Sequence, residues 1–415
     1  MLPIDPELIA RLADEHGTPY YLYDAEVIRR RVAALRGFDV IRYAQKASSN
    51  VHLLSLLRAE GCVVDAVSLG EIERAVRAGF AAAGDPAGIV YTADMIDDPT
   101  LDRILELGIP VNAGSPEMLE QLGRRHSGHK VWLRINPGFG HGHSRKTNTG
   151  GEWSKHGIWH GYLDEALRHI EKYRLDLVGL HMHIGSGADF EHLKQVCDAM
   201  VSQVRALGVD VRAISGGGGL PIPYREGDTP FDTGALHGLW AAARDEVASI
   251  VGHPVALEIE PGRFLVAESG VLVARVCTSK RVGPNRFIVV DAGFDNLMRP
   301  AMYGSYHAIS IVRRAGALAE GPTEPTVVAG PLCESGDVFT QAEGGVVVPR
   351  ELALAGSGDL VVLHDAGAYA ASMASTYNTR PLAPELLLDG GRVRTIRRRQ
   401  TVAALLELED VAGGD

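Results

Sequence analysis

The chain has 415 residues, of which 46% are hydrophobic and 22% charged, a composition typical of a soluble globular protein and unlike that of a disordered chain. It carries 41 basic and 52 acidic residues, so its net charge is 41 − 52 = −11, which disfavours nucleic acid or an anionic membrane surface as the main partner. No apolar run approaches the roughly 18–20 residues of a membrane helix, and the four scattered cysteines form neither a disulfide framework nor a zinc-ligand pattern, so we expect a reducing, cytoplasmic setting and no metal.

Short apolar runs rich in β-branched residues alternate with helical segments along residues 39–260. The predicted strands are 39–44, 63–68, 89–92, 109–112, 131–135, 175–182, 211–215 and 255–260. Segments between them have apolar residues three and four positions apart, which predicts helices over 51–59, 71–78, 99–107, 116–124, 163–173, 190–207 and 234–251. This alternation predicts an eight-stranded parallel α/β barrel of the TIM type. An open doubly wound sheet is the alternative, but no GxGxxG turn follows the first strand.

After Glu260 the pattern changes to extended runs separated by Gly-Pro, Gly-Gly and Gly-Asp turns. The runs are 271–276, 287–290, 326–329, 359–363 and 393–396, and a short helical stretch follows at 401–408. Few long helices lie between these runs. The sequence therefore predicts a second, mostly antiparallel β domain.

Enzymes built on such a barrel place their sites at the carboxyl ends of the strands. Taken in chain order, those ends carry Lys46, then Asp65, Ser68 and Glu71, then Arg134, then His181, His183 and Ser186, then the glycines 216–219, and finally Glu260 and Arg263. One mouth of the barrel is therefore expected to collect a lysine, histidines, acids, arginines and a glycine loop.

The chemistry of this set indicates a phosphorylated carbonyl cofactor. A glycine run is either a flexible turn or a phosphate cradle, and its place after strand seven, with Arg263 nearby, favours phosphate. A lysine at a barrel mouth can form an imine, and an imine with a phosphate site points to pyridoxal phosphate. Glu260 could bond the ring nitrogen or be a structural ion-pair partner. His183 could stack on the ring or be a packed core histidine, while His181 should face the other side of its strand.

The motifs YAQKASSN, HMHIGSG, EPGR and GPLCESGD, in this order, resemble those of the bacterial diaminopimelate decarboxylases. These belong to the alanine-racemase-like class of pyridoxal phosphate enzymes, which also holds ornithine and arginine decarboxylases. The resemblance extends from about Thr18 to about Arg399. It implies a cofactor-binding barrel over residues 27–265, a β domain formed by 1–26 and 266–415, and a homodimer with shared active sites.

The resemblance also implies roles for individual residues that hold the cofactor. Lys46 matches the imine lysine, His183 the ring-stacking histidine and Glu260 the acid at the pyridine nitrogen. The phosphate cradle is matched by Ser186, Gly217, Gly218 and Gly219. Arg263 and Tyr369 match residues that lie near both phosphate and substrate.

For the substrate, Arg299 and Tyr303 match ligands of a carboxylate, and Cys333 and Glu334 match a pair donated by the neighbouring subunit. The implied reaction converts meso-2,6-diaminopimelate to L-lysine and carbon dioxide, the last step of lysine biosynthesis. Cys333 would return a proton to Cα, unless it is a buried small hydrophobic residue. Arg299 would bind the distal carboxylate and Glu334 the distal ammonium.

Other functions stay open at this point. A decarboxylase of the same class acting on ornithine, lysine or arginine would have no distal carboxylate for Arg299 to bind. A racemase could use Tyr303 or Tyr369 as its second acid. A non-catalytic pyridoxal phosphate-binding protein would need no second domain of this kind. A phosphate-binding barrel without an imine would differ in its absorbance spectrum.

The chain departs from the family pattern at Gln45, Ser48 and Pro221, and in the glycine- and histidine-rich segment 137–157, which ends in SKHG. This segment has the composition of a lid that closes over substrate. Lys146 and Lys155 lie in it and are rival candidates for the imine, although a mobile loop orients a lysine poorly.

Overall fold

The computed structural model describes residues 4–140, 149–185 and 190–409, which fall into two compact units. The barrel unit comprises residues 29–222 and 230–265, and the β unit comprises residues 1–28, 223–229 and 266–415. The range 27–265 expected for the barrel domain thus encloses a segment, Pro223–Thr229, that belongs to the β unit.

The barrel unit contains the predicted closed parallel barrel, which is confirmed. Within the described residues its eight strands are β2 (Val40–Ala44), β3 (Val63–Ala66), β4 (Ile89–Tyr91), β5 (Val111–Ala113), β6 (Lys130–Asn136), β8 (Asp176–Met182), β9 (Ala213–Ser215) and β10 (Ala256–Ile259). The parallel pairing of β10 with β2, with Glu258 opposite Val40, closes the ring. A two-residue strand, β7 (Ile158–Trp159), adds to the end of β6.

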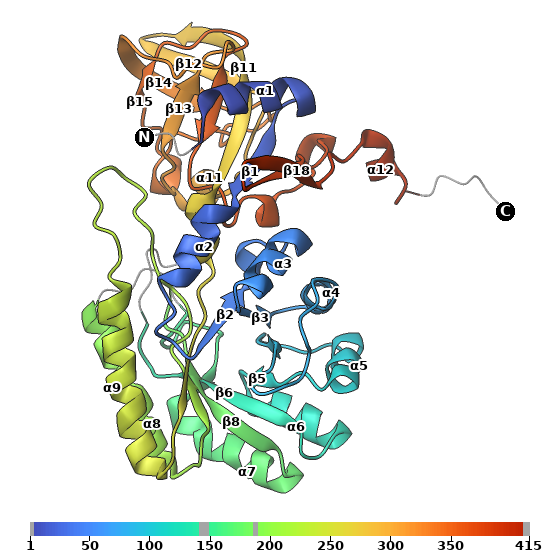
Figure 1. Cartoon of the computed structure of the whole chain (residues 1–415), viewed down its shortest axis with the longest axis vertical. Coiled ribbons are helices and arrows are strands. Elements are labelled where there is room, and N and C mark those ends of the chain that lie inside the picture. The colour runs from blue at the N-terminus through green and yellow to red at the C-terminus, as the bar shows by residue number, and fades with distance from the viewer. Residues whose placement is uncertain (1–3, 141–148, 186–189, 410–415) are drawn as a thin grey trace, which may run out of the picture. The chain divides into compact units, whose positions relative to one another are not determined.

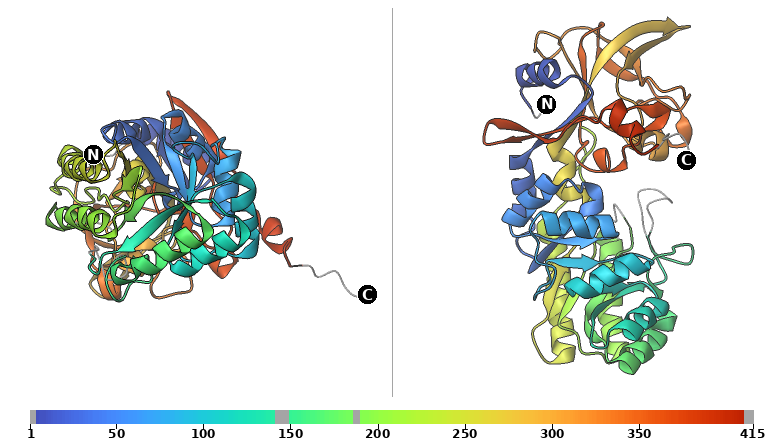
Figure 2. Two further views of the ribbon diagram at one scale, coloured as in Figure 1. Left: turned by 90° about the horizontal axis from the view of Figure 1, so that it is seen from below. Right: turned by 90° about the vertical axis from the view of Figure 1, so that its right-hand side faces the viewer.

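Helices cover the outside of the barrel, as Figure 2 shows in its view from below. They are α3 (Val51–Ala59), α4 (Leu69–Arg77), α5 (Asp98–Leu107), α6 (Pro116–Arg125), α7 (Leu163–Tyr173), α8 (Phe190–Leu207) and α9 (Thr233–Val251), with the short α10 (Arg263–Val266) after β10. Polar N-caps begin many of them: Asp97 accepts a bond from Thr100 N, and Ser115 one from Met118 N. Helix α2 (Ala25–Ala33) crosses the sequence boundary between the units.

A buried ion pair fills the amino-terminal end of the barrel. Arg42 Nε and Nη2 each lie 2.9 Å from Glu258 Oε2, and Nη1 donates to Ala87 O at 3.0 Å. Both side chains are almost fully buried, at 2% and 5% exposure. Breaking such a pair typically costs about 3–5 kcal/mol, because the remaining charge is buried without a partner. This pair therefore holds β2 and β10 together where the ring closes.

The β unit is a mixed, mostly antiparallel sheet, as predicted (Figure 1). Its strands are β1 (Tyr20–Asp24), β11 (Gly270–Val282), β12 (Asn285–Val290), β13 (Ile309–Val312), β14 (Thr323–Ala329), β15 (Arg350–Ala353), β16 (Leu360–Leu363), β17 (Glu385–Asp389) and β18 (Arg392–Arg397). Strand β1 lies between β11, with which it is antiparallel, and β17, with which it is parallel. The amino-terminal residues are thus part of this sheet.

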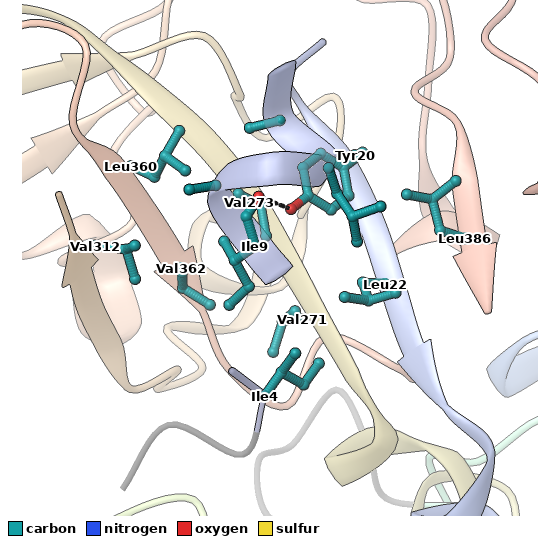
Figure 3. Close-up of a cluster of buried hydrophobic side chains, with 13 residues drawn as sticks. Ile4, Ile9, Tyr20, Leu22, Val271, Val273, Val312, Leu360, Val362 and Leu386 are labelled. Carbon is teal, nitrogen blue, oxygen red and sulfur yellow. Dashed lines mark hydrogen bonds between the residues drawn. The ribbon is translucent and has the colours of Figure 1, made fainter. Parts of the chain in front are cut away.

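An apolar cluster joins the amino-terminal helix α1 (Pro6–His16) to the sheet of the β unit (Figure 3). Ile9 and Leu12 of α1 pack with Leu22 of β1 and Val273 of β11. The Tyr20 hydroxyl donates to Ile9 O at 2.8 Å, so this polar group is satisfied inside the cluster. Two short helices, α11 (Arg299–Tyr303) and α12 (Val402–Leu406), complete the unit. Of the helices in the described residues, none has the length and apolar character needed to cross a bilayer.

Candidate active site

Lys46 projects from a one-turn helix, Gln45–Ala47, that directly follows β2. Its neighbours Gln45 and Ala47 are buried, whereas Lys46 is exposed, so the turn presents the amine at the carboxyl end of the strand. The amine lies close enough to Asp65 and Glu71 to lower the pKa of both carboxyl groups, although burial raises them more. The structure therefore places Lys46 among acids at the barrel mouth.

The rival lysines do not share this setting. Lys155 is 77% exposed and lies 3.4 Å from Asp94, and the adjacent His156 Nδ1 lies 2.7 Å from the same carboxylate. Asp94 thus anchors the SKHG end of segment 137–157. Lys146 lies outside the described residues.

Glu260 follows β10 and is bound by groups from two neighbouring strands. His181 Nε2, from β8, lies 2.8 Å from Glu260 Oε2, and Ser215 Oγ, from β9, lies 3.5 Å from Oε1. Burial raises the pKa of Glu260, but His181, which is hydrogen-bonded to it, and Arg42 lower it below its ordinary value. Glu260 is therefore a buried carboxylate that stays ionised and is paired with His181.

Asp65, at the end of β3, has the opposite tendency. Burial and the negative charge of Glu260 raise its pKa, against the effects of a bond from Thr92 and of Lys46. Its Oδ1 is buried without a hydrogen-bond partner among the described residues. Two carboxyl groups whose environments push their pKa values apart are typical of acid–base sites.

His183 follows β8 and is held by the glycine loop. The Gly218 N–H donates to His183 Nδ1 at 3.3 Å, so Nδ1 carries no proton and the ring is neutral. Burial, Arg134 and Lys46 lower the pKa of His183, which agrees with a neutral ring. A neutral imidazole can lie against a cationic pyridine ring without charge repulsion.

The glycine loop packs too closely for any other residue. Gly217 has φ +62°, and a Cβ there would lie 2.7 Å from Met182 O; Gly219 has φ +99°, and a Cβ there would lie 2.1 Å from Gly185 O. The Gly217 N–H already donates to Ser215 Oγ at 3.2 Å.

These residues fit pyridoxal phosphate. The mouth offers an exposed amine, an ionised buried acid, a neutral imidazole and a glycine loop, which match the carbonyl, ring nitrogen, ring face and phosphate of that cofactor. Arg263 lies at the first position of α10, partly buried. Ser186, the remaining residue expected at the phosphate, lies outside the described residues.

The expected substrate ligands lie in the β unit. Arg299, the first residue of α11, is buried; its Nη1 lies 2.9 Å from His307 Nε2, and its guanidinium carbon lies 5.0 Å from the Tyr224 ring centre. His307 Nδ1 lies 2.7 Å from the His364 carbonyl, which can only accept, so Nδ1 donates and Nε2 accepts from Arg299. His307 is therefore neutral, and it orients Arg299 without cancelling its charge. Tyr303, at the end of α11, is partly buried.

Cys333 and Glu334 lie in a tight turn and are both exposed, so Cys333 is not a buried hydrophobic residue. Asp337 fixes the turn, because its carboxylate accepts from Leu332 N at 2.8 Å and Phe294 N at 2.7 Å. The Cys333 N–H donates to Asn378 Oδ1 at 2.9 Å. The thiol is thus presented on a fixed backbone.

Tyr369 has φ +57°, which is rare for a residue with a side chain. Strain of this kind costs about 1–3 kcal/mol and is found mainly at functional sites.

Sequence reasoning missed residues that organise the loops. The Asn136 side chain, at the end of β6, accepts from Gly138 N at 3.1 Å and Gly151 N at 2.9 Å, and donates to Gly151 O at 3.0 Å. It thereby joins the beginning of segment 137–157 to Gly151. Asn136 directly follows the predicted strand 131–135, which was the one available signal. Ser68 and Glu71, expected at the mouth, also cap α4: Ser68 accepts from Glu71 N, and Glu71 accepts from Val67 N.

Comparisons with known proteins show the family to which the chain belongs. The model of the pyridoxal binding domain of pyridoxal-dependent decarboxylases matches residues 25–267. The chain is 62% identical to the diaminopimelate decarboxylase of Streptomyces coelicolor over 406 residues, which is 98% of this chain and 92% of that protein.

Solved structures extend the likeness to the whole fold. A crystal structure of a diaminopimelate decarboxylase is similar with a TM-score of 0.97 and 58% identity, covering 100% of this chain and 99% of the other. The diaminopimelate decarboxylase of Helicobacter pylori, complexed with L-lysine, is similar with a TM-score of 0.83 and 31% identity, covering 96% and 98%.

Proposed function

This chain belongs to the pyridoxal-dependent decarboxylases, and from that membership we propose that it converts meso-2,6-diaminopimelate to L-lysine and carbon dioxide, the last step of lysine biosynthesis. The observation that carries the proposal is a neutral His183 that lies within electrostatic reach of both the buried, ionised Glu260 and Lys46. The names of the relatives supply the substrate, and one similar structure holds L-lysine, the expected product.

Each residue of the mouth has a distinct task. Pyridoxal phosphate, when bound, supplies an electron sink for the bond that breaks at Cα. Lys46 provides the amine that holds the cofactor until substrate arrives, and Glu260 keeps a proton on the ring nitrogen. His183 covers one ring face. Phosphate binding falls to the loop that comprises Gly217, Gly218 and Gly219, together with Ser186, Arg263 and Tyr369.

Cys333 returns a proton to Cα after carbon dioxide leaves. The thiol is exposed, and Asp337 and Asn378 hold its turn in place. A thiol carries a proton that it can donate, and its exposure leaves it open to a substrate.

Arg299 and Glu334 select the substrate, because diaminopimelate carries a second amino-acid group at its far end. Arg299 binds the distal carboxylate, with Tyr303 as a further ligand, and Glu334 binds the distal ammonium. The purified protein should release carbon dioxide from the meso isomer and leave the LL isomer, lysine and ornithine nearly untouched. A preference for ornithine would instead establish a diamine-forming decarboxylase.

Replacing Arg299 by alanine should lower kcat/KM for diaminopimelate by about 10²–10³-fold, because a buried carboxylate that loses its partner costs about 3–5 kcal/mol. The absorbance spectrum of the bound cofactor should stay unchanged, since Arg299 does not contact it. Arg299→Lys should recover part of the loss, because the charge returns without the planar fork. Arg313→Ala, which removes an arginine paired with Asp359 in the same unit, is the control and should keep full efficiency. An unchanged kcat/KM in Arg299→Ala would mean that Arg299 does not bind the distal carboxylate.

The enzyme acts as a homodimer in the cytoplasm, with Cys333 and Glu334 donated to the neighbouring subunit's barrel. Both side chains are exposed in the single chain, and its four cysteines are free thiols, as a reducing compartment requires.

Mixing inactive Lys46→Ala subunits with inactive Cys333→Ala subunits should restore activity. If sites are shared, each heterodimer has one intact site, so a random equal mixture recovers about a quarter of wild-type activity. Carbon dioxide release measures the recovery, and mass spectrometry of differently tagged subunits proves exchange. No recovery after proven exchange would mean that each site is built within one chain.

A further inference from the structure

We infer that His181 is a positioning residue, which fixes Glu260 as the acceptor for the proton on the cofactor's ring nitrogen. The inference rests on the proposed function only in requiring bound pyridoxal phosphate. Strand alternation alone assigned His181 to the side away from the ring, with no task in the site. The structure instead places its ring directly behind the catalytic acid.

The contact spans three adjacent strands. His181 lies near the end of β8 and is 1% exposed, while Glu260 follows β10, and β9 separates these two strands in the barrel. The Nε2–Oε2 distance is 2.8 Å, and Ser215 of β9 lies 3.5 Å from the other carboxylate oxygen. The Glu260 N–H also donates to Gly217 O at 2.8 Å. Both the backbone and the side chain of Glu260 are therefore constrained, and His181 provides the short side-chain contact.

The direction of the hydrogen bond follows from the chemistry of the pair. An ionised carboxylate only accepts, so His181 Nε2 carries the proton. Its Nδ1 is buried and has no partner among the described residues. A second ring proton would therefore be buried without an acceptor, at a cost of about 1–3 kcal/mol. His181 thus acts on Glu260 through an N–H donor, and the N–H of a neutral amide can replace that donor.

The surrounding charges show why this donor matters. Titratable groups from five strands interact electrostatically with Glu260. They are Arg42 of β2, Asp65 of β3, Arg134 of β6, His181 of β8 with His183 directly after that strand, and Glu258 of β10. Arg42 is already paired with Glu258, and Asp65 repels the ionised form of Glu260. Without His181, burial dominates and the pKa of Glu260 rises. A protonated Glu260 no longer favours a protonated ring nitrogen.

The test compares His181→Leu, which removes the donor, with His181→Gln, which keeps an N–H. The matched control is His129→Leu, because His129 is also buried in the barrel unit and its Nε2 lies 2.8 Å from Ile109 O. The first measurement is the ¹⁵N chemical shift of ring-labelled pyridoxal phosphate bound without substrate, as a function of pH. The second is the pH profile of kcat and KM with diaminopimelate.

In His181→Leu the ring nitrogen should lose its proton at a lower pH than in wild type, and the acid limb of kcat should move to higher pH. We expect kcat to fall about 10–100-fold with little change in KM. Losses of this size are typical when a residue that is hydrogen-bonded to a metal ligand is removed, and His181 has the same relation to Glu260. His181→Gln should recover most of kcat and of the chemical shift. His129→Leu should change neither measurement.

An unchanged ¹⁵N shift and acid limb in folded, cofactor-loaded His181→Leu would overturn the inference. So would an equal loss in His181→Gln, which would mean that the imidazole itself is required. The chemical shift needs no substrate, so it still reports on His181 if the wild type fails to decarboxylate diaminopimelate. That failure would count against the proposed function alone.

Discussion

Replacing Lys46 by alanine should reduce decarboxylation by about 10⁴-fold or more, the largest loss that we expect from any single substitution. Lys46 is the exposed amine in a turn whose other residues are buried, and it lies among the acids of the barrel mouth. The purified wild type should be yellow, and borohydride should attach the cofactor irreversibly to the peptide that contains Lys46. Steady-state release of carbon dioxide measures the loss.

Lys155→Ala is the matched control, since Lys155 is a lysine of the same unit paired with Asp94 at the surface. It should keep both the cofactor and the colour. A borohydride-labelled peptide that carries Lys155 or Lys146 would show that the reacting amine has been misassigned.

Glu260→Gln should lower kcat by about 10²–10³-fold while the cofactor stays bound, because an amide cannot stabilise a protonated ring nitrogen as a carboxylate does. His181 would still donate to the amide oxygen, so the local structure should persist. Single-turnover absorbance after mixing with substrate would place the loss in the chemical step.

Glu258→Gln provides the comparison, because Glu258 lies two residues earlier on the same strand and faces the same interior. It pairs with Arg42, so its loss should lower the free energy of unfolding by about 3–5 kcal/mol while kcat changes far less. Urea unfolding and steady-state rates separate the two effects. Equal turnover losses in both variants would mean that Glu260 acts only through the stability of the barrel.

The barrel could be predicted because each strand is a compact apolar run bounded by clear breaks. Strand β1 was missed, because Tyr20, Tyr21, Leu22 and Tyr23 are all buried and its two faces show no alternation. Its partners, β11 and β17, lie hundreds of residues away in sequence, so no local sequence pattern predicts this strand pairing.

Sequence reasoning proposes site residues whose type carries its own chemistry, and it misses residues that act through another. Lys46 and Glu260 belong to the first kind. His181, Asn136 and Asp337 belong to the second, because their tasks depend on hydrogen bonds to distant backbone or side-chain groups. The same holds for His307, whose neutral ring is set by a carbonyl at His364. The spacing of residues along the sequence does not predict such contacts.

The place of β1 in its sheet also bears on how the chain is synthesised. One of its two neighbours, β17, begins at Glu385, so β1 leaves the ribosome long before its parallel partner exists. At about 5–20 residues per second, the interval is on the order of 20–70 seconds. During that time all eight barrel strands emerge and can close their ring, while the three tyrosines of β1 stay without their final sheet. The apolar residues of β1 must therefore remain unaggregated until β17 has been synthesised.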